Sequence, residues 1–153
     1  MLKKVLKDER GLSLVELLAV VVIMAIIAGI GAVAITGVIQ KNREDAAISS
    51  LQSVIAAANL YQASNGEDPA KAIGATNANI TAKNLIEDGF ITQIGGLNGN
   101  DKSENIKFDL DENSKLITTV DENTFIAGKK TNKPLTDRSE ADIAKLTRTD
   151  FYK

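Results

Sequence analysis

Apolar residues form one long unbroken run near the start of the chain and shorter periodic patterns later. The run from Leu17 to Ile35 has 19 residues without a charged or polar side chain, and Val38 and Ile39 extend it past Thr36. As a helix it would rise about 28 Å, close to the roughly 30 Å of a bilayer core. Secretory signals have shorter apolar regions of about 7–15 residues. The run therefore predicts a membrane-spanning helix, and an ordinary single-pass anchor is one reading of it.

The pattern changes beyond the run but stays helical. Residues 40–45 are polar, and apolar residues then recur at steps of three and four, at Ala47, Ile48, Leu51, Val54, Ile55, Ala58 and Tyr61. This spacing is typical of an amphipathic helix. No proline or glycine lies between Val38 and Asn65, and Gly66 is placed as a stop. We predict one helix from about residue 12 to residue 65. The charges at 41–45 indicate a solvated collar at the membrane surface or, alternatively, pairing between subunits.

The remaining residues predict a small domain. Residues 66–79 are rich in Gly, Ala, Asn and Asp and predict a loop, after which Thr81 opens a short helix, 82–88, that Gly89 ends. Alternating residues predict strands at 106–110, 116–120 and 125–127, with turns at 111–114 and 121–123. These strands would form an antiparallel meander. Its inner face, Ile106, Phe108 and Leu110, is expected to pack on Leu51, Ile55 and Tyr61, which makes the fold α+β.

The C-terminal region is polar. Asp137 and Glu140 have the spacing of a capping box, which predicts a helix through Leu146 followed by a surface tail, 147–153. Basic residues are frequent from Lys129 onward, but acidic residues are interspersed among them. A mixed solvated surface is therefore favoured over a nucleic-acid-binding face.

One acidic cluster resembles the start of a calcium loop. Asp109, Asp111 and Asn113 have the alternate spacing of such loops, but Ser114 and Val120 stand where an EF-hand needs Gly and Glu. A tight hairpin turn is the favoured interpretation, because Asp, Asn and Ser are turn residues. Calcium binding is kept as a minor hypothesis, and no other cofactor is expected.

Composition and charge exclude several classes of function. The 153 residues include no cysteine and no histidine, which excludes thiol nucleophiles, disulfides, ordinary Cys/His zinc sites and histidine relays. No nucleophile, base or phosphate-binding loop stands out, so we do not expect an enzyme. Of the 18 basic and 20 acidic residues, four basic and two acidic ones lie in residues 1–11, which leaves 14 basic and 18 acidic beyond them. A mildly acidic body gives no general reason to bind nucleic acid.

Glu16 is the feature that separates this chain from an ordinary anchor. It lies between Leu14-Val15 and Leu17-Leu18, at the start of the apolar run. A carboxylate at the centre of a bilayer costs about 2.5–3.5 kcal/mol, and less near the interface. The neighbouring apolar residues include no cation, so a partner is expected to come from processing or from another molecule.

Residues 11–30, GLSLVELLAVVVIMAIIAGI, resemble the N-terminal cleavage and methylation motif of type IV pilins and of secretion or competence pseudopilins. The resemblance implies cleavage between Gly11 and Leu12 by a prepilin peptidase, methylation of the new amino terminus on Leu12, and pairing of Glu16 with the amino terminus of a neighbouring subunit. Two departures are Leu12, where phenylalanine is usual, and the lack of a proline in the apolar helix. Gly29 and Gly31 could weaken the helix locally or allow close packing.

The resemblance implies a domain plan and a function. Residues 1–11 would be a leader, 12–39 a membrane and filament-core helix, 40–65 its amphipathic continuation, and 66–153 a pilin-like globular head. The chain would be a subunit of a type IV pilus or pseudopilus, or alternatively a minor tip pilin that binds DNA or a surface. Implied partners are copies of itself, the peptidase, the assembly platform and its ATPase, and membrane lipid.

Localisation follows from the same features. Lysines before the run predict a cytoplasmic N-terminus by the positive-inside rule. A single-pass membrane protein would become a cell-surface filament after assembly. The lack of cysteines hints at a Gram-positive source, because disulfides are common in Gram-negative major pilins.

Overall fold

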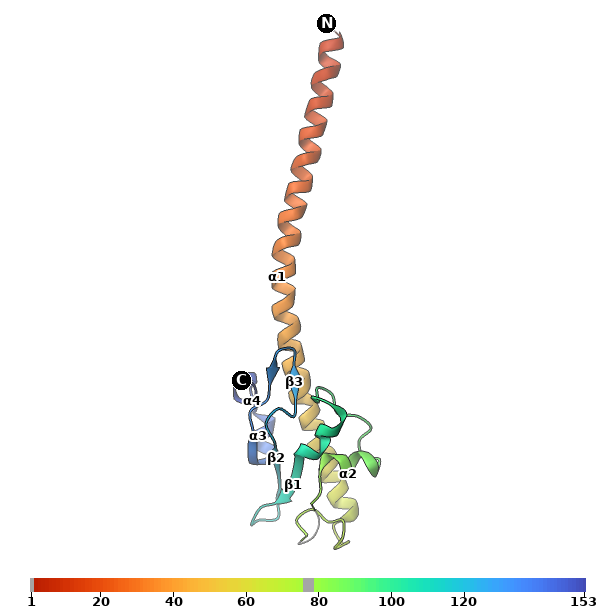
Figure 1. Cartoon of the computed structure of the whole chain (residues 1–153), viewed down its shortest axis with the longest axis vertical. Coiled ribbons are helices and arrows are strands. Elements are labelled where there is room, and N and C mark those ends of the chain that lie inside the picture. The colour runs from red at the N-terminus through yellow and green to blue at the C-terminus, as the bar shows by residue number, and fades with distance from the viewer. Residues whose placement is uncertain (1, 76–78) are drawn as a thin grey trace. The chain divides into compact units, whose positions relative to one another are not determined.

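A computed structural model describes residues 2–75 and 79–153, with the backbone alone for residues 2–13 and residue 100. The chain divides into two compact units, an N-terminal unit, Met1–Ile39, and a C-terminal unit, Gln40–Lys153. Helix α1 (Leu2–Asn65) contributes to both (Figure 1). Its end at Asn65 is as predicted. Its start at Leu2 shows that the expected start at residue 12 was wrong for the uncleaved chain, because residues 2–11 are also helical.

The C-terminal unit places short elements around residues 40–65 of α1. They are α2 (Ala82–Glu87), a 3-10 helix η1 (Asn100–Asn105), β1 (Ile106–Leu110), β2 (Leu116–Val120), β3 (Ile126–Ala127), β4 (Lys130–Thr131), β5 (Leu135–Ser139), α3 (Glu140–Ala144) and α4 (Arg148–Phe151). The expected α+β fold, a long apolar helix followed by a small antiparallel sheet, is confirmed.

The sheet differs from the predicted meander in its third strand. The order is β1-β2-β5, with β2 antiparallel to both neighbours, while β3 and β4 form a separate two-stranded hairpin. Ile106 pairs with Val120 and Leu110 with Leu116, as the predicted turn at 111–114 requires. β5 was missed because only Leu135 of its five residues is buried. The expected third strand, 125–127, instead supplies β3 of the hairpin.

The core lies between the sheet and one face of α1. Leu51, Ile55 and Tyr61 are at most 2% exposed, and Ile106 and Phe108 belong to the same buried cluster. Leu110, predicted to face inward with them, is half-buried at the margin of that cluster. Burying each large side chain contributes about 1.5–3 kcal/mol. The predicted packing of the sheet on the amphipathic half of α1 is therefore confirmed.

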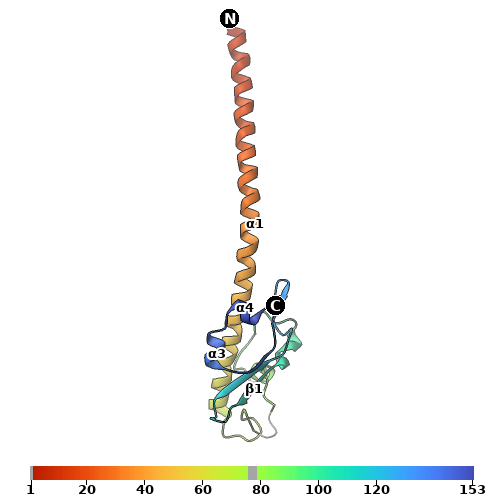
Figure 2. The same ribbon diagram turned by 90° about the vertical axis from the view of Figure 1, so that its left-hand side faces the viewer.

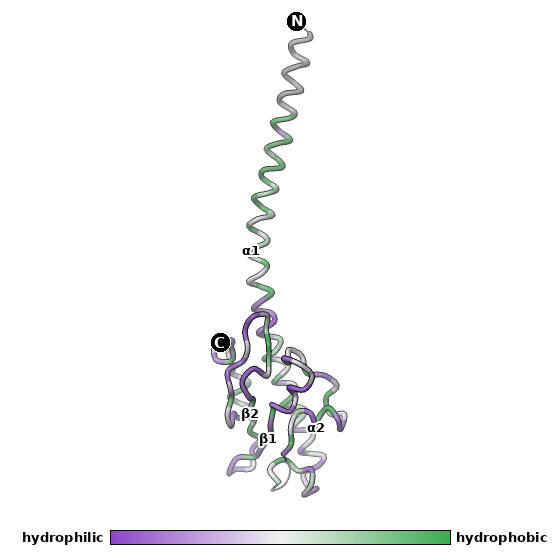
Figure 3. Tube along the Cα trace, viewed as in Figure 1, coloured by the Kyte–Doolittle hydropathy of each residue, from purple (hydrophilic) through white to green (hydrophobic). Residues whose placement is uncertain are grey.

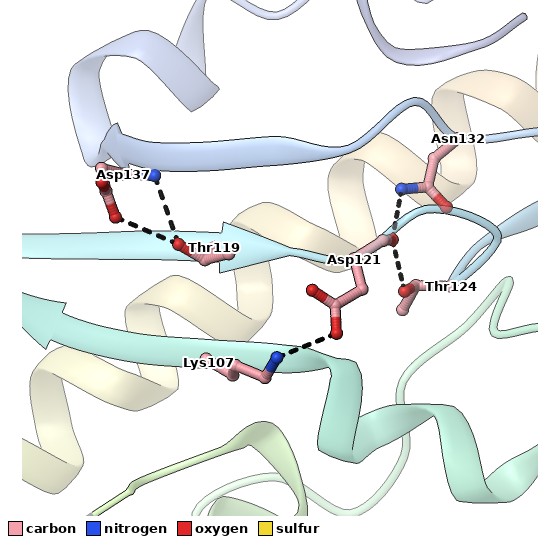
Figure 4. A network of polar contacts seen from close by, with 6 residues as sticks. All are labelled: Lys107, Thr119, Asp121, Thr124, Asn132 and Asp137. Carbon is pink, nitrogen blue, oxygen red and sulfur yellow. Dashed lines mark hydrogen bonds and ion pairs between the residues drawn. The ribbon is translucent and has the colours of Figure 1, made fainter.

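Asn132 organises the junction between the sheet and the hairpin. Its side chain is fully buried, accepts a hydrogen bond from the Phe125 amide at 2.8 Å, and donates to the carbonyl oxygens of Asp121 and Lys133. Thr124 donates to the same Asp121 carbonyl at 2.6 Å, as Figure 4 shows. A buried polar group is tolerated when it is satisfied in this way. Asn132 thus fixes the path of the chain from β2 into the hairpin.

Two more contacts in Figure 4 join neighbouring strands at the surface. Lys107 on β1 forms an ion pair of 2.9 Å with Asp121, which follows β2. The Thr119 hydroxyl on β2 and the Asp137 amide on β5 lie 3.2 Å apart. Asp137 adopts a positive φ of 49° within β5, and the register shifts there. Its predicted role as a helix cap is therefore wrong, because it lies in a strand.

The helix after β5 is capped two residues later than predicted. Ser139 is the N-cap of α3, and its hydroxyl accepts a hydrogen bond from the Asp142 amide at 3.2 Å. Gln52 and Asn59 of α1 bond to α3, which lies alongside α1 in both views (Figures 1 and 2). α3 ends at Ala144, two residues before the predicted end at Leu146. The capping-box type was predicted correctly, but the residues that form it were not.

The C-terminal tail is only partly a surface segment. Phe151 is fully buried and Tyr152 is 3% exposed, and the Phe151 ring packs against the rings of both Tyr152 and Phe125. The backbone of Lys133 donates to the Phe151 carbonyl, and that of Lys153 to the Thr131 carbonyl. The prediction of an exposed tail holds for Thr147, Thr149, Asp150 and Lys153, but it was wrong for Phe151 and Tyr152, whose aromatic side chains pack into the core.

The short helix and the loop before it follow the prediction. Thr81 is the N-cap of α2, with its amide bonded to Asn84 Oδ1 at 2.9 Å, and Gly89 follows the helix with a φ of +78°. In the loop from residue 66, the Asp68 amide donates to the Asn65 carbonyl, and the Asp68 carbonyl accepts from the amides of Lys71 and Ala72. Ile73, which follows these turns, is buried. Residues 76–78 of that predicted loop lie outside the described residues.

Candidate functional site

The apolar segment of α1 is uncovered along its length. Every large apolar side chain between Leu14 and Ile39 is exposed, from 43% at Ile39 to 76% at Val33. The hydropathy colouring of Figure 3 is hydrophobic along most of this segment. An ideal Cβ on Gly29, Gly31 or Gly37 would meet no atom within 4 Å. Uncovered apolar surfaces of this size mark contacts with a membrane or another protein. By length and composition, the described part of α1 is the one helix able to cross a bilayer.

Glu16 lies near the start of this segment and is exposed. Its neighbours Leu14, Leu17 and Leu18 are each at least 64% exposed. Within residues 14–75 and 79–153, no hydrogen bond or ion pair to Glu16 is found. The carboxylate therefore has apolar neighbours and no described partner within its own chain, as the sequence predicts.

The predicted cleavage site lies in the segment for which the structure describes the backbone alone. Gly11 and Leu12 lie within the bounds of α1, and their side chains are outside the described residues. Cleavage between them and methylation of Leu12 stay predictions.

A second cluster of polar groups lies at the beginning of the C-terminal unit. Glu44 is only 3% exposed, and its Oε1 accepts a hydrogen bond from Gln40 at 2.8 Å and pairs with Lys130 at 3.1 Å. Burial works against ionisation of Glu44, but Gln40 and Lys130 outweigh it and hold the pKa below its usual value. Glu44 is therefore a buried anion that ties α1 to the β3–β4 hairpin.

The sequence contained a signal for Glu44 that the collar interpretation missed. Glu44 precedes Ala47 and Ile48 by three and four residues, so it lies on the same helix face as the buried stripe. The next residue, Asp45, points elsewhere and pairs with Arg148 at 3.0 Å. The segment 41–45 is thus partly a set of internal contacts and only partly a solvated collar.

The Tyr152 hydroxyl lies close to this cluster. Burial, together with the nearby Glu44 charge, raises the pKa of Tyr152 to about 12. Among the described residues, its hydroxyl is the one buried side-chain polar atom without a hydrogen-bond partner. Its position near a buried carboxylate was not predictable from the tail sequence alone.

The calcium candidates form the predicted hairpin turn. Asp111 Oδ1 accepts hydrogen bonds from the amides of Asn113 and Lys115, both at 2.8 Å, while Asp109 Oδ1 accepts one from Leu110. Ser114 has a φ of 60°, typical of a turn. Over residues 14–75 and 79–153, no group of three or more acidic side chains has a metal-binding arrangement. The carboxylates are directed at their own backbone, and calcium binding stays an untested prediction.

Comparison with known proteins identifies a known motif in the N-terminal region. Residues 6–32 match the prokaryotic N-terminal methylation motif. Neither the curated proteins nor the solved structures gave a significant match. The chain carries the signature of type IV pilins and pseudopilins, and its α+β fold is consistent with a pilin-like fold. The motif and the exposed apolar helix indicate a pilin-like, membrane-anchored protein of a structural rather than enzymatic kind.

Proposed function

We propose that this protein is a structural subunit of a type IV pilus or pseudopilus. It enters the membrane as a prepilin with a cytoplasmic N-terminus, is cleaved between Gly11 and Leu12, is methylated on Leu12, and then polymerises through the apolar half of α1. The prepilin peptidase, an assembly platform and its ATPase act on it. The product is a filament at the cell surface.

The observation that carries this proposal is a carboxylate that has no partner among the described side chains and lies on an uncovered apolar helix. Lipid can cover the apolar side chains of residues 14–39, but it offers Glu16 no fixed cation. Cleavage creates an ammonium on Leu12, four residues before Glu16, and the same group on a neighbouring copy can pair with it. Separating the members of a well-buried ion pair costs about 3–5 kcal/mol, which is enough to select one register between subunits.

A tip pilin that binds nucleic acid is the second candidate, and the C-terminal region gives it little support. Arg148 pairs with Asp45, and Lys130 and Lys153 pair with Glu44 and Glu122. These cations are therefore partly neutralised within the chain. Abundance in sheared filaments separates the two roles, because a tip subunit would be present in traces.

The test combines mass spectrometry with one substitution. The membrane-resident protein should begin at methylated Leu12, and Glu16→Ala should still insert and be cleaved but should be at least about tenfold depleted from sheared filaments, given the energy of a buried pair. Glu112→Ala, which removes an exposed carboxylate from the β1–β2 turn, is the matched control. Normal assembly of Glu16→Ala would exclude the assembly role of Glu16, and an intact Met1 would exclude processing.

A further inference from the structure

Four basic side chains gather where the C-terminal unit begins. Lys41 and Arg43 follow Gln40 on α1, and Lys129 and Lys130 belong to the turn and second strand of the β3–β4 hairpin. All four are exposed. They come from segments almost ninety residues apart in the sequence, so no local pattern reveals the group.

The hairpin is held against Gln40. Gln40 Nε2 donates to the Ala127 carbonyl at 2.7 Å. A Cβ on Gly128 would lie 2.3 Å from Gln40 Oε1, and the φ of Gly128 is +62°. The positive φ favours glycine at this turn, and a larger side chain there would also have to displace the end of the Gln40 side chain. The turn is fixed beside the first residue after Ile39.

Helical geometry places the two cations of α1 on either side of the hairpin. Successive residues of a helix are rotated by about 100°. Gln40 and Glu44 are about 40° apart and both bond to the hairpin, so Lys41 and Arg43 point about 80° to either side of that direction. The basic groups thus flank the hairpin instead of pointing into it.

The acidic groups near this surface are already occupied. Glu44 is buried and bonded to Gln40 and Lys130, and Asp45 pairs with Arg148. In the described part of the chain, no carboxylate pairs with Lys41, Arg43 or Lys129. The hairpin also exposes Ile126, which is 39% accessible and is the one large apolar side chain outside α1 that is exposed in that part. The surface therefore combines three unpaired cations with one apolar side chain.

We propose that this surface, Lys41, Arg43, Ile126 and Lys129, binds the anionic headgroups of the outer leaflet before assembly. Ile39 ends the apolar run and Gln40 directly follows it. In the inserted chain, the surface beside Gln40 would therefore lie where the bilayer meets water. Lipid phosphates complement the cations, and Ile126 can enter the apolar boundary as interfacial residues do. The inference requires membrane insertion but not polymerisation.

The experiment uses the full chain in lipid nanodiscs. Hydrogen exchange of residues 126–131 is compared in phosphatidylcholine and in a mixture of phosphatidylcholine and phosphatidylglycerol, at low and high salt. We expect slower exchange in the anionic discs, with the difference reduced by salt. In the double variant Lys41→Gln and Lys129→Gln, docking should weaken about 25-fold, since each basic residue near an anionic surface contributes about fivefold.

A matched pair of substitutions separates a local surface from net charge. Lys71→Gln and Lys115→Gln remove two other exposed lysines, and neither pair removes a side-chain contact found in the described residues. The control should keep the lipid effect. Equal exchange in the two lipid mixtures, or an equal loss in both double variants, would overturn the proposal. A variant that assembles poorly while showing no lipid effect would assign the surface to contacts between subunits instead. Co-purification with the discs reports insertion independently.

Discussion

The two halves of α1 differ in apolar content and have opposite surroundings: 21 of residues 14–39 are apolar, against 12 of residues 40–65. Between Leu14 and Ile39 every large apolar side chain is at least 43% exposed, whereas Leu51, Val54, Ile55 and Tyr61 in the second half are at most 2% exposed. The first half is apolar on all sides, and the second is apolar along one stripe. A helix that is apolar all round needs an apolar environment all round, and one with a stripe needs a single partner face.

The difference shows where each half finds its partner. The stripe of the second half is covered by the sheet and α3 of the same chain, so its burial is complete in a single copy. No residue of the first half belongs to the buried hydrophobic cluster that covers the second half. Under the proposed function, the cover of the first half comes from lipid before assembly and from other copies afterwards.

Truncating one leucine in each half gives the largest expected contrast in stability. Leu51→Ala should lower the free energy of unfolding of the C-terminal unit by about 2–5 kcal/mol, because it removes a fully buried side chain and leaves a cavity. Leu18→Ala makes the same chemical change at an exposed position and should leave that free energy within about 0.5 kcal/mol. Denaturant unfolding of the full chain in detergent measures both. Equal losses would show that the two halves of α1 are not distinct in the way described.

The sequence predicts most reliably those elements whose pattern is local. The apolar run, the stripe at steps of three and four, and the Gly66 stop define α1, and the alternation in β1 and β2 defines a hairpin around Asp111. β5 has no such alternation, since the residues between Leu135 and Ser139 are polar and exposed. Its position is set by pairing with β2, which no local pattern of β5 contains.

The candidate site divides in the same way. Glu16 could be found from the sequence because a charge in an apolar run is conspicuous. The Glu44, Gln40 and Lys130 cluster depends on the hairpin reaching α1 from 87 residues away along the chain, as in the bond from Gln40 to Ala127. Contacts of that kind follow from tertiary packing. The one sequence feature that pointed to this cluster was the position of Glu44 on the same helix face as the buried stripe.

A smaller effect is expected at the buried anion that joins α1 to the hairpin. Glu44→Gln keeps the shape but removes the charge that pairs with Lys130, and should cost about 1.5–3 kcal/mol at neutral pH. The pKa of Glu44 is lowered on folding, so its stabilisation is present above the unfolded value of 4.5 and is lost as pH falls through the folded value. The wild-type protein should therefore lose stability below about pH 4.5, and Glu44→Gln should lose less.

Thermal unfolding between pH 3 and 7 measures this dependence. Glu112→Gln, at an exposed position of the β1–β2 turn, is the control and should follow the wild-type curve. If Glu44→Gln loses as much stability in acid as the wild type, the Glu44 contact does not account for the acid sensitivity, and other carboxylates must.

The smallest expected effect concerns a polar atom that the C-terminal unit buries without a partner. Tyr152→Phe removes that hydroxyl and should leave stability at neutral pH unchanged or raise it by up to about 1 kcal/mol, because no hydrogen bond found in the described residues is lost. Burial and the Glu44 charge raise the pKa of Tyr152 from 10.0 to about 12, so the unfolded chain releases this proton first as pH rises, and stability falls from pH 10 upward. Tyr152→Phe should reduce that alkaline loss in a thermal melt series.

Tyr61→Phe is the matched comparison. Burial and Asp88 raise the pKa of Tyr61, but its hydroxyl bonds to Asp88, so this variant should cost about 1 kcal/mol at neutral pH. Equal destabilisation by both substitutions would show that the Tyr152 hydroxyl has a partner in solution.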